Sequence, residues 1–470
     1  MPKELRAELH EGFADWLESE AGSAGELDEF VGYHLEQSHR YREELGPVDD
    51  AGRTMAGRAG GHLLTAGERA LGRGDVAGAE QLLGRAMALL PADDPRALSA
   101  MPSLGQALYY GGQLERTLEF LDEAAARAAD AGADTIGARV AIHRALVRTH
   151  FGPEFAMRPG LAESEKQTAL LETAGDDLGL AEGWSTIGVF RFWLGDGAGG
   201  LEAIERARTH AERAGSARLI RLTSNESLGP FVWGPVPSEE VVRRASGLIA
   251  EMGAAGGDSF ELTQSLAVAY AMRGEIDLAD EHFDRSLSRA RELGDRLHLA
   301  AAHPQLEAGL ILGRYPETES LARDGIERLR EMGEHGYLAT SLIYLAEAIV
   351  SQDRPDEAET TLKKAEEHAS EDDAVTAIGI RRVRGEILRR QGRLDDAERH
   401  AREAIAFADP TDYLYEKAKS HQLLGEILVA RDERPGGLEH LRAALDLFER
   451  KGILVLLEPM RRRIAEVESR

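Results

Sequence analysis

The stretch GRGDVAGAEQLLGRAMALLP, residues 72–91, recurs in varied form along the chain and decides its fold. Related stretches are RGEIDLADEHFDRSLSRARELGD (273–295), QDRPDEAETTLKKAEEHA (352–369) and QGRLDDAERHAREAIAFADP (391–410). In each, a glycine or aspartate turn is followed five positions later by a small residue, and then by apolar and small residues at helical spacing. Internal repetition of this kind is typical of a solenoid built from stacked copies of one unit.

The turn of the repeat recurs about every 40 residues, which predicts ten units. The turn residues are Gly74, Gly112, Gly195, Gly274, Gly313, Asp353, Gly392 and Asp432, and two degenerate units are centred near Pro153 and Gly234. A second series of glycines stands where the second helix of a unit is expected to end in a left-handed residue. These are Gly132, Gly175, Gly215, Gly253, Gly294, Gly333 and Gly452. Together the two series predict a helical hairpin in each unit.

The composition agrees with a chain that is helical nearly throughout. Alanine, leucine, glutamate and arginine dominate the 470 residues, β-branched residues are sparse, and aromatic residues make up only 6%. A single hairpin cannot bury its apolar stripe, whereas stacked neighbours can. The array is therefore expected to form one cooperative all-α solenoid with almost no sheet.

Small residues at fixed positions predict close packing of the two helices of a unit. They are Ala79, Ala279, Ala358 and Ala397 on the second helix and Gly67, Gly188, Gly385 and Gly425 on the first. The first unit resembles the tetratricopeptide repeat at Leu63, Ala66, Gly67, Ala70, Gly74, Ala79, Leu83, Ala86 and Pro91. This resemblance implies a right-handed superhelix of about ten tetratricopeptide-like hairpins. The later units are about six residues longer and mostly lack the proline, and they resemble the long-period repeats at the C-terminal end of large bacterial regulators.

The first 60 residues do not fit the repeat. Leu5, Leu9, Phe13, Trp16 and Leu17 lie on one face of a first expected helix, and residues 29–45 form a second. The stretches ELHEGFADWLE (8–18) and DEFVGYHLEQSHRYREELGPVD (28–49) resemble a linker in bacterial multidomain signal-transduction ATPases, which are fused to class III adenylate cyclase domains or to helix-turn-helix output domains. The resemblance implies a helical linker over residues 1–60, similar to the end of an ATPase module, before a solenoid over 61–470.

Several classes of function are disfavoured by composition and by missing motifs. A formal net charge of −27 opposes direct binding of nucleic acid, and the sequence has no cysteine for disulfides or thiolate-bound metals. No apolar run reaches the roughly 20 residues that span a membrane, and the N-terminus lacks the pattern of a signal peptide, so we expect a cytoplasmic protein. Metalloprotease, hydrolase, dinucleotide and phosphate-loop motifs are missing from the sequence. We therefore expect no enzyme activity, catalytic residue, metal site or cofactor.

The resemblance to tetratricopeptide repeats implies candidate binding residues on the first helix of each unit, which lines the inner groove in that family. The candidates are Tyr109, Tyr110, His143, His150, Phe151, Phe192, Trp193 and Phe231. Rigid aromatic side chains give contact area at low entropic cost, so these residues fit a groove for a peptide or small molecule. They equally fit packing between units, and both interpretations stay open. The loop GPFVWGPVPS, residues 229–238, is expected to be an ordered plug or rim.

The C-terminal half is charged at the corresponding positions. Glutamates stand at 307, 347, 386 and 426, and one unit carries Arg382, Arg389 and Arg390. This spacing favours a structural ladder of charges between helices, and the alternative is a site for a peptide carboxylate or phosphate.

These observations predict a non-catalytic scaffold that binds a protein or peptide in its concave groove, as the sensor or regulatory arm of a bacterial signalling or transcriptional regulator. One alternative is that the chain is the C-terminal part of a longer adenylate cyclase or ATPase whose activity lies outside it. Another is a receptor for a small effector in the groove. The expected partners are a protein or peptide, an ATPase or output domain in cis or in trans, and further copies of the chain in a homo-oligomer, with neither direct nucleic-acid binding nor a membrane.

Overall fold

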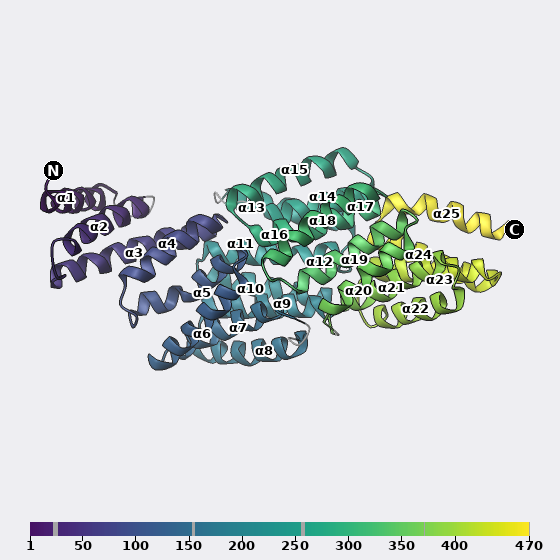
Figure 1. Cartoon of the computed structure of the whole chain (residues 1–470), viewed down its shortest axis with the longest axis horizontal. Coiled ribbons are helices and arrows are strands. Elements are labelled where there is room, and N and C mark those ends of the chain that lie inside the picture. The colour runs from purple at the N-terminus through teal and green to yellow at the C-terminus, as the bar shows by residue number, and fades with distance from the viewer. Residues whose placement is uncertain (22–26, 153–155, 255–258, 371, 470) are drawn as a thin grey trace.

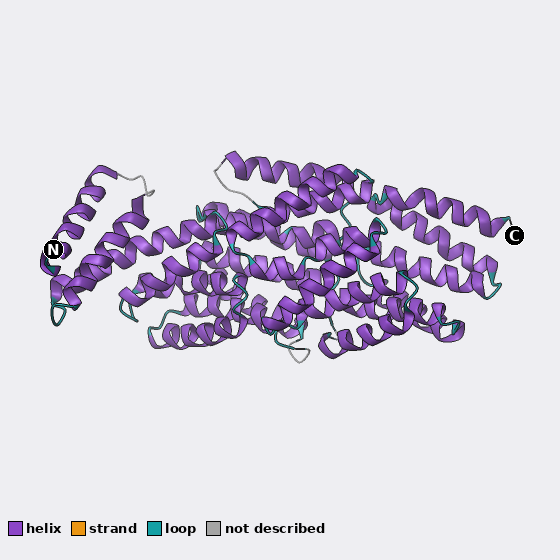
Figure 2. Ribbon diagram, turned by 45° about the horizontal axis from the view of Figure 1, so that its top comes forward, coloured by secondary structure: helices purple, strands orange, loops and turns teal. Residues whose placement is uncertain are grey.

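The structure is a computed structural model of the whole chain, and it describes residues 1–21, 27–152, 156–254, 259–370 and 372–469. Within these ranges the regular elements are all helices, and none of those helices combines the length and apolar character needed to cross a bilayer. The molecule is elongated, and its two termini lie at opposite ends of the long axis (Figures 1 and 2).

Ten helical hairpins follow one another along the described chain, as the repeat spacing predicts. The first five are α3 (Asp50–Gly72) with α4 (Val76–Leu89), α5 (Pro95–Tyr110) with α6 (Leu114–Asp130), α7 (Asp134–Arg148) with α8 (Met157–Ala174), α9 (Asp177–Trp193) with α10 (Gly197–Arg213), and α11 (Ala217–Glu226) and α12 (Leu228–Val232) with α13 (Ser238–Ala254). The other five are α14 (Phe260–Arg273) with α15 (Ile276–Leu293), α16 (Arg296–Ala301) and α17 (His303–Ile311) with α18 (Tyr315–Glu331), α19 (Gly336–Ser351) with α20 (Pro355–His368), α21 (Ala374–Arg390) with α22 (Leu394–Ala408), and α23 (Leu414–Ala430) with α24 (Arg434–Lys451). A last helix, α25 (Leu454–Glu468), covers the final hairpin. The fold is the predicted right-handed superhelical solenoid of tetratricopeptide-like hairpins.

The turns confirm most of the predicted breaks between helices. All six glycines of the first turn series have positive φ, from 70° to 95°, and Asp353 and Asp432 adopt the same left-handed conformation at 63° and 66°. In the second series, Gly253 departs from the prediction because α13 continues through it to Ala254. The degenerate turn expected near Pro153 falls outside the described residues.

Glycine also permits the close contact of paired helices. A Cβ atom placed on Gly67 would lie 2.7 Å from the side chain of Leu83, and one on Gly425 would lie 2.8 Å from Leu441. Real Cβ atoms do not approach carbon atoms so closely, so a larger residue would push the helices apart. The small residues predicted from the sequence therefore fix the distance between the two helices of a hairpin.

The superhelix is tight enough for one turn to contact the next. The carboxylate of Asp372 accepts hydrogen bonds from the first two backbone N–H groups of α8 at 3.0 and 2.9 Å, and that of Asp412 does the same for α10 at 2.9 and 2.7 Å. Ser238 donates to the carbonyl of Gly452 at 2.8 Å, and Tyr413 donates to that of Phe192. The partners lie 214–221 residues apart in sequence, so a full turn takes about five to six units.

An additional hairpin, α1 (Lys3–Ala21) and α2 (Asp28–Glu43), packs against α3 at the N-terminal end (Figure 1). Its buried contacts include Ala14, Leu17, Val31 and Leu35. The apolar face expected on the first helix is only partly buried, since Leu5, Leu9, Phe13 and Trp16 are 43–54% exposed. The division proposed at residue 60 falls inside α3, which runs without a break from residue 50 to residue 72.

Candidate functional site

The inner helices of eight consecutive units surround one cavity of about 150 Å³. Its lining comes from α5, α7, α9, α11 with α12, α14, α16 with α17, α19 and α21, which are first helices of their hairpins, together with Met157 at the start of α8 and short connecting residues. These segments span residues 109 to 375, and the tight superhelix brings them to one place. The concave surface thus converges on one half-open cavity.

Most of the aromatic candidates lie at this cavity. Tyr109, Tyr110, His150, Phe192 and Trp193 line it, and all of them except the half-buried Trp193 are less than 9% exposed. The structure places the other three elsewhere. His143 lines a small adjoining cavity of about 20 Å³, Phe151 packs at the edge of the main core, and Phe231 is buried against α13 and α14. Their roles as ligand contacts remain predictions.

Several lining residues were not singled out from the sequence. They are Glu226, Trp233, Glu261, His298, His303, Tyr337 and Tyr344. Local irregularity explains four of them, Glu226, Trp233, His298 and His303, whereas Glu261, Tyr337 and Tyr344 lie in the undivided helices α14 and α19. In the fifth unit the first helix divides after Glu226, and in the seventh it divides at Ala302, which has a φ of 48°. Counting back from the turn therefore gives the wrong positions in those units, although Tyr337 lies in a regular helix where the same count with a wider choice of positions would have found it.

A buried polar chain joins the third unit to the eighth at one wall of the cavity. His150 Nε2 lies 2.8 Å from the hydroxyl of Tyr109, and His150 Nδ1 lies 2.7 Å from Glu334. Glu334 also accepts the backbone N–H groups of Tyr337 and Leu338, each at 2.8 Å, at the start of α19. Because every polar side-chain atom in this series of hydrogen bonds has a partner, the wall is pre-organised in one arrangement.

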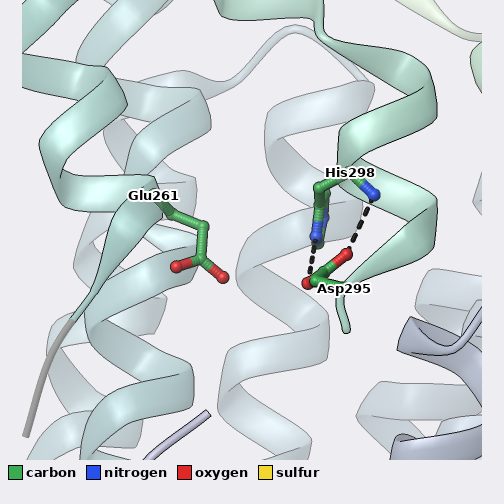
Figure 3. A group of neighbouring side chains, drawn as sticks. All are labelled: Glu261, Asp295 and His298. Carbon is green, nitrogen blue, oxygen red and sulfur yellow. Dashed lines mark hydrogen bonds and ion pairs between the residues drawn. The ribbon is translucent and has the colours of Figure 1, made fainter. Parts of the chain in front are cut away.

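A second polar cluster contains Glu261, Asp295 and His298, whose possible ligand atoms lie within 4.8 Å of one another (Figure 3). Asp295 caps α16 by accepting the backbone N–H of His298 at 3.0 Å, and it also contacts the imidazole Nδ1 at 3.0 Å. Burial lowers the pKa of His298, but Asp295 and the nearby glutamates outweigh it and raise this pKa to about 9. Glu261 accepts a hydrogen bond from Asn225 at 2.8 Å and lies 3.6 Å from Arg221. The cluster therefore fits a protonated His298 imidazole between two carboxylates, and the oxygen atoms of these carboxylates already accept hydrogen bonds from the protein.

Glu226 is the last residue of α11, and its carboxyl group borders both cavities. Burial raises its pKa to about 7, with Glu261 adding to the rise and His298 and the Tyr110 hydroxyl opposing it. The ion pairs of the described residues do not include Glu226, and Arg221 on the same helix lies 3.6 Å from Glu261. Glu226 is thus an acidic residue in the wall of both cavities.

The charged residues of the C-terminal half form the interhelical ladder that the sequence favours. Arg382, which is 6% exposed, contacts Glu347 at 2.6 Å and Glu416 at 3.2 Å, and Lys419 contacts Glu416 at 2.7 Å. At the end of the ladder, Glu307 accepts a hydrogen bond of 2.5 Å from Tyr344. Arg389 and Arg390 pair with Glu386 on their own helix, at 2.6 and 2.8 Å, and Arg390 also contacts Asp353 of the preceding unit at 3.2 Å. A role for these three arginines in ligand binding remains a prediction.

The loop at residues 229–238 is ordered, as expected, and is held by one buried lysine. Lys451 Nζ donates to the carbonyl oxygens of Phe231, Gly234 and Val236 at 2.9, 2.7 and 2.7 Å. These bonds fix the loop to the end of α24. Trp233 of the loop reaches the cavity and donates to Glu307 at 3.1 Å, so the loop connects the cavity to the ladder of charges.

Comparisons with known proteins support the fold. No protein-family model matches the sequence, and no curated protein sequence matches it either. Similar solved structures include the APC/C hetero-tetramer Cut9–Hcn1, at 12% identity and a TM-score of 0.52, covering 98% of this chain and 90% of that one. Yeast Tom70 matches at 12% identity and a TM-score of 0.35, and the match covers 97% of this chain and 96% of Tom70. A Rap protein in complex with Competence and Sporulation Factor matches at 12% identity and a TM-score of 0.41, and the match covers 79% of this chain and 98% of the Rap protein. These neighbours are tetratricopeptide-type helical repeat proteins. The likeness to Cut9–Hcn1 supports the fold, and at 12% identity it concerns the fold alone.

Proposed function

We propose that this chain is a non-catalytic repeat scaffold that binds a peptide or an extended protein segment, one side chain of which enters the cavity. The observation that supports this most is the convergence of eight units on a single cavity with aromatic walls. Pre-formed cavities with mainly apolar walls and a few convergent polar groups are the usual sites of ligand binding.

The size of the cavity limits what it holds. A space of about 150 Å³ accommodates a group about the size of benzene, so one side chain fits and a folded segment does not. The rest of the ligand would lie outside the cavity. Rigid rings such as Trp193 and Tyr337 offer a large contact area and lose little rotamer entropy, which favours an anchoring role.

The cavity also offers a mechanism for a sensor. Its walls come from both ends of a superhelical turn, so an occupant contacts units that are far apart in sequence. A ligand that fits one packing of these units better than another shifts the balance between the two. We infer that ligand binding changes the curvature of the array, and that the chain acts as the regulatory arm of a bacterial signalling or transcriptional regulator.

Selection of peptides tests the proposal. The wild-type chain is used to enrich peptides from a random phage-displayed library, and the enriched sequences are synthesised for calorimetry. Trp193→Ala should weaken binding at least tenfold, since truncation of an anchoring tryptophan typically costs 2 kcal/mol or more. Trp184→Ala is the matched control, because Trp184 lies on the same helix but stacks on Arg206 outside the cavity. Equal loss in both variants, or no enrichment at all, contradicts the proposal.

The small-effector receptor remains a second candidate because the same cavity would hold a free molecule of that size. A thermal-shift screen of small molecules separates the two functions. A receptor for an effector gains stability from a compound alone, since any ligand of the folded state alone raises its stability. A peptide scaffold responds only to peptides that carry the anchoring side chain.

The exposed apolar row on α1 supports the proposal of a partner domain at the N-terminal hairpin. Leu9 is 54% exposed and Trp16 is 52% exposed, and Phe30 on α2 is 59% exposed. An exposed cluster of this kind commonly marks a protein contact. We propose an ATPase or output domain, in cis or in trans, as the occupant. The mass of the endogenous protein, detected through a C-terminal tag, tests the cis arrangement, since a species near the calculated 51.2 kDa contradicts it.

A further inference from the structure

We propose that the group bound in the cavity is an organic cation, an alkyl guanidinium or ammonium, with Glu226 as its counter-ion and the surrounding aromatic rings as its walls. This inference rests on the proposed function, since it assigns a chemical class to the occupant of the same cavity. The cation is either an arginine or lysine side chain of a peptide or a free amine.

Glu226, which is half-buried and hydrogen-bonded to the Tyr110 hydroxyl, differs from the fully buried glutamates of the described residues, which have basic partners. Glu182 contacts Arg139 at 2.7 Å and Arg218 at 2.6 Å, and Glu334 contacts His150 at 2.7 Å. Burial of a carboxylate without a basic group in direct contact is costly, so proteins normally pair it. A cationic ligand would complete at Glu226 the pairing that the protein supplies internally elsewhere.

The carboxyl groups around the cavity outnumber the basic side chains that pair with them. Asp295 is paired with His298, and Glu261 is paired with Arg221. Asp373 also borders the cavity, where it caps α21 by accepting the backbone N–H of Val375 at 3.0 Å. Glu226 and Asp373 are therefore the two lining carboxyl groups without an ion pair among the described residues. A site with this balance attracts a cation and repels an anion.

The walls of the cavity suit a cation as well. Seven phenylalanine, tyrosine and tryptophan residues border it together with Glu226: Tyr109, Tyr110, Phe192, Trp193, Trp233, Tyr337 and Tyr344. The negative faces of such rings attract guanidinium and ammonium groups, and the attraction grows when the cation is removed from water. The net charge of −27 acts over a longer range and steers cationic ligands towards the protein.

Ionisable groups around Glu226 set the pH range of a test. They are Tyr109 and Tyr110 on α5, His143 and His150 on α7, Glu182 on α9, Arg221 on α11, Glu261 on α14, Asp295 and His298 at α16, His303 on α17, Tyr337 and Tyr344 on α19, and Asp373 at the start of α21. The pKa of Glu226 is raised to about 7 by burial, so below neutral pH a cation must displace a proton. Affinity should then fall by up to tenfold per pH unit, and the Glu226→Gln variant should lose the part of this dependence that belongs to Glu226.

The experiment compares charged probes with neutral isosteres. Blocked pentapeptides Gly-Gly-X-Gly-Gly, in which X is arginine, citrulline, lysine or norleucine, are titrated against the wild-type protein at pH 8, and the free amine 4-aminobutylguanidine is titrated separately. Tryptophan fluorescence reports binding, because Trp193 and Trp233 line the cavity. The inference predicts that the arginine peptide binds at least tenfold more tightly than the citrulline peptide, or the lysine peptide at least tenfold more tightly than the norleucine peptide. Saturation by the free amine with similar affinity would identify a free amine as the source of the cation.

Two variants make the result specific. Glu226→Gln preserves the shape of the side chain and should reduce the preference for a charged probe to less than threefold. Glu239→Gln removes the same charge from an exposed position on α13 and should leave the preference unchanged. Equal binding of charged and neutral probes to the wild-type protein overturns the inference. If the peptides of the phage selection depend on Trp193 but carry no essential basic residue, the proposed function stands and this inference fails.

Discussion

Replacement of Glu226 by glutamine should stabilise the free protein, and the gain should grow with pH. The pKa of this carboxyl group is raised from 4.5 to about 7 by burial. A raised folded-state pKa means that the protonated form stabilises the fold fully below pH 4.5, and that this contribution is lost as the pH rises through 7. Glutamine resembles the protonated form at every pH.

The size of the effect follows from the shift in pKa. A shift of the pKa from 4.5 to about 7 corresponds to a difference of roughly 3 kcal/mol in the free energy of unfolding between pH values well below 4.5 and well above 7. Glu226 keeps part of its surface accessible within the cavity, so we expect about half of that, near 1.5 kcal/mol. In a chain of this length such a gain raises the melting temperature by about 1–2 °C.

Calorimetry of the two proteins between pH 5.5 and 8.5 is the assay. The difference in melting temperature between Glu226→Gln and wild type should increase across this range, while Glu239→Gln should show a difference that is independent of pH. A constant difference for Glu226→Gln, or a variant that is less stable than wild type at pH 8.5, would refute the electrostatic reasoning. It would mean that Glu226 already has a compensating partner in the free protein.

Three further predictions concern the fold. Lys451→Met should lower the free energy of unfolding by about 3 kcal/mol, measured by urea denaturation, because two buried carbonyl groups and one partly buried carbonyl group lose their donor. Amide exchange should rise first in residues 229–238, and exchange that rises elsewhere instead would count against this. Gly392→Ala should lower the free energy of unfolding by about 1 kcal/mol, because residue 392 has a φ of 76°. Gly84→Ala, inside a helix and free of close contacts, should instead raise it by about 0.5 kcal/mol. Equal effects of the two changes on the urea midpoint would be inconsistent with a left-handed turn at residue 392. Asp412→Ala should lower the free energy of unfolding by about 1 kcal/mol, because the first two N–H groups of α10 lose their acceptor although Asp196 still caps the helix. The variant should also enlarge the radius of gyration in solution scattering, an effect that Asp409→Ala, placed at the end of α22, should lack.

Much of the fold could be predicted from the sequence because the repeat is local. A turn such as that at Gly74 or Gly392 is visible in the sequence, because it depends on the backbone conformation of a single residue. The spacing of Gly67 and Ala79 likewise reports contacts within a single hairpin. Ten such units in register leave few alternatives to a solenoid.

The cavity could be predicted only in part, because it depends on contacts between distant units. Tyr109 and Trp193 were found since their units are regular, but Glu226 and His298 lie in helices that divide and shift the register. The pitch of the superhelix was also beyond sequence reasoning. It depends on small packing angles that add up over five to six units, and contacts such as Asp412 with α10 appear only when the turn is complete.

The exposed row on α1 shows a third kind of limit. The spacing of Leu9 and Trp16 predicts an apolar face but does not say what covers it, and in this chain the hairpin packs through Ala14 and Leu17. A pattern of apolar residues thus predicts that a face exists, and only the structure shows which part of it the chain itself buries.

The most direct test of the account is photo-cross-linking of a selected peptide that carries a diazirine at its anchoring residue. Mass spectrometry of the cross-linked protein should locate the adduct on α5, α9 or α19, at residues that border the cavity such as Tyr109, Trp193 or Tyr337. Adducts confined to the outer helices, α6, α10 or α20, would contradict the central claim that the ligand is held inside the superhelix.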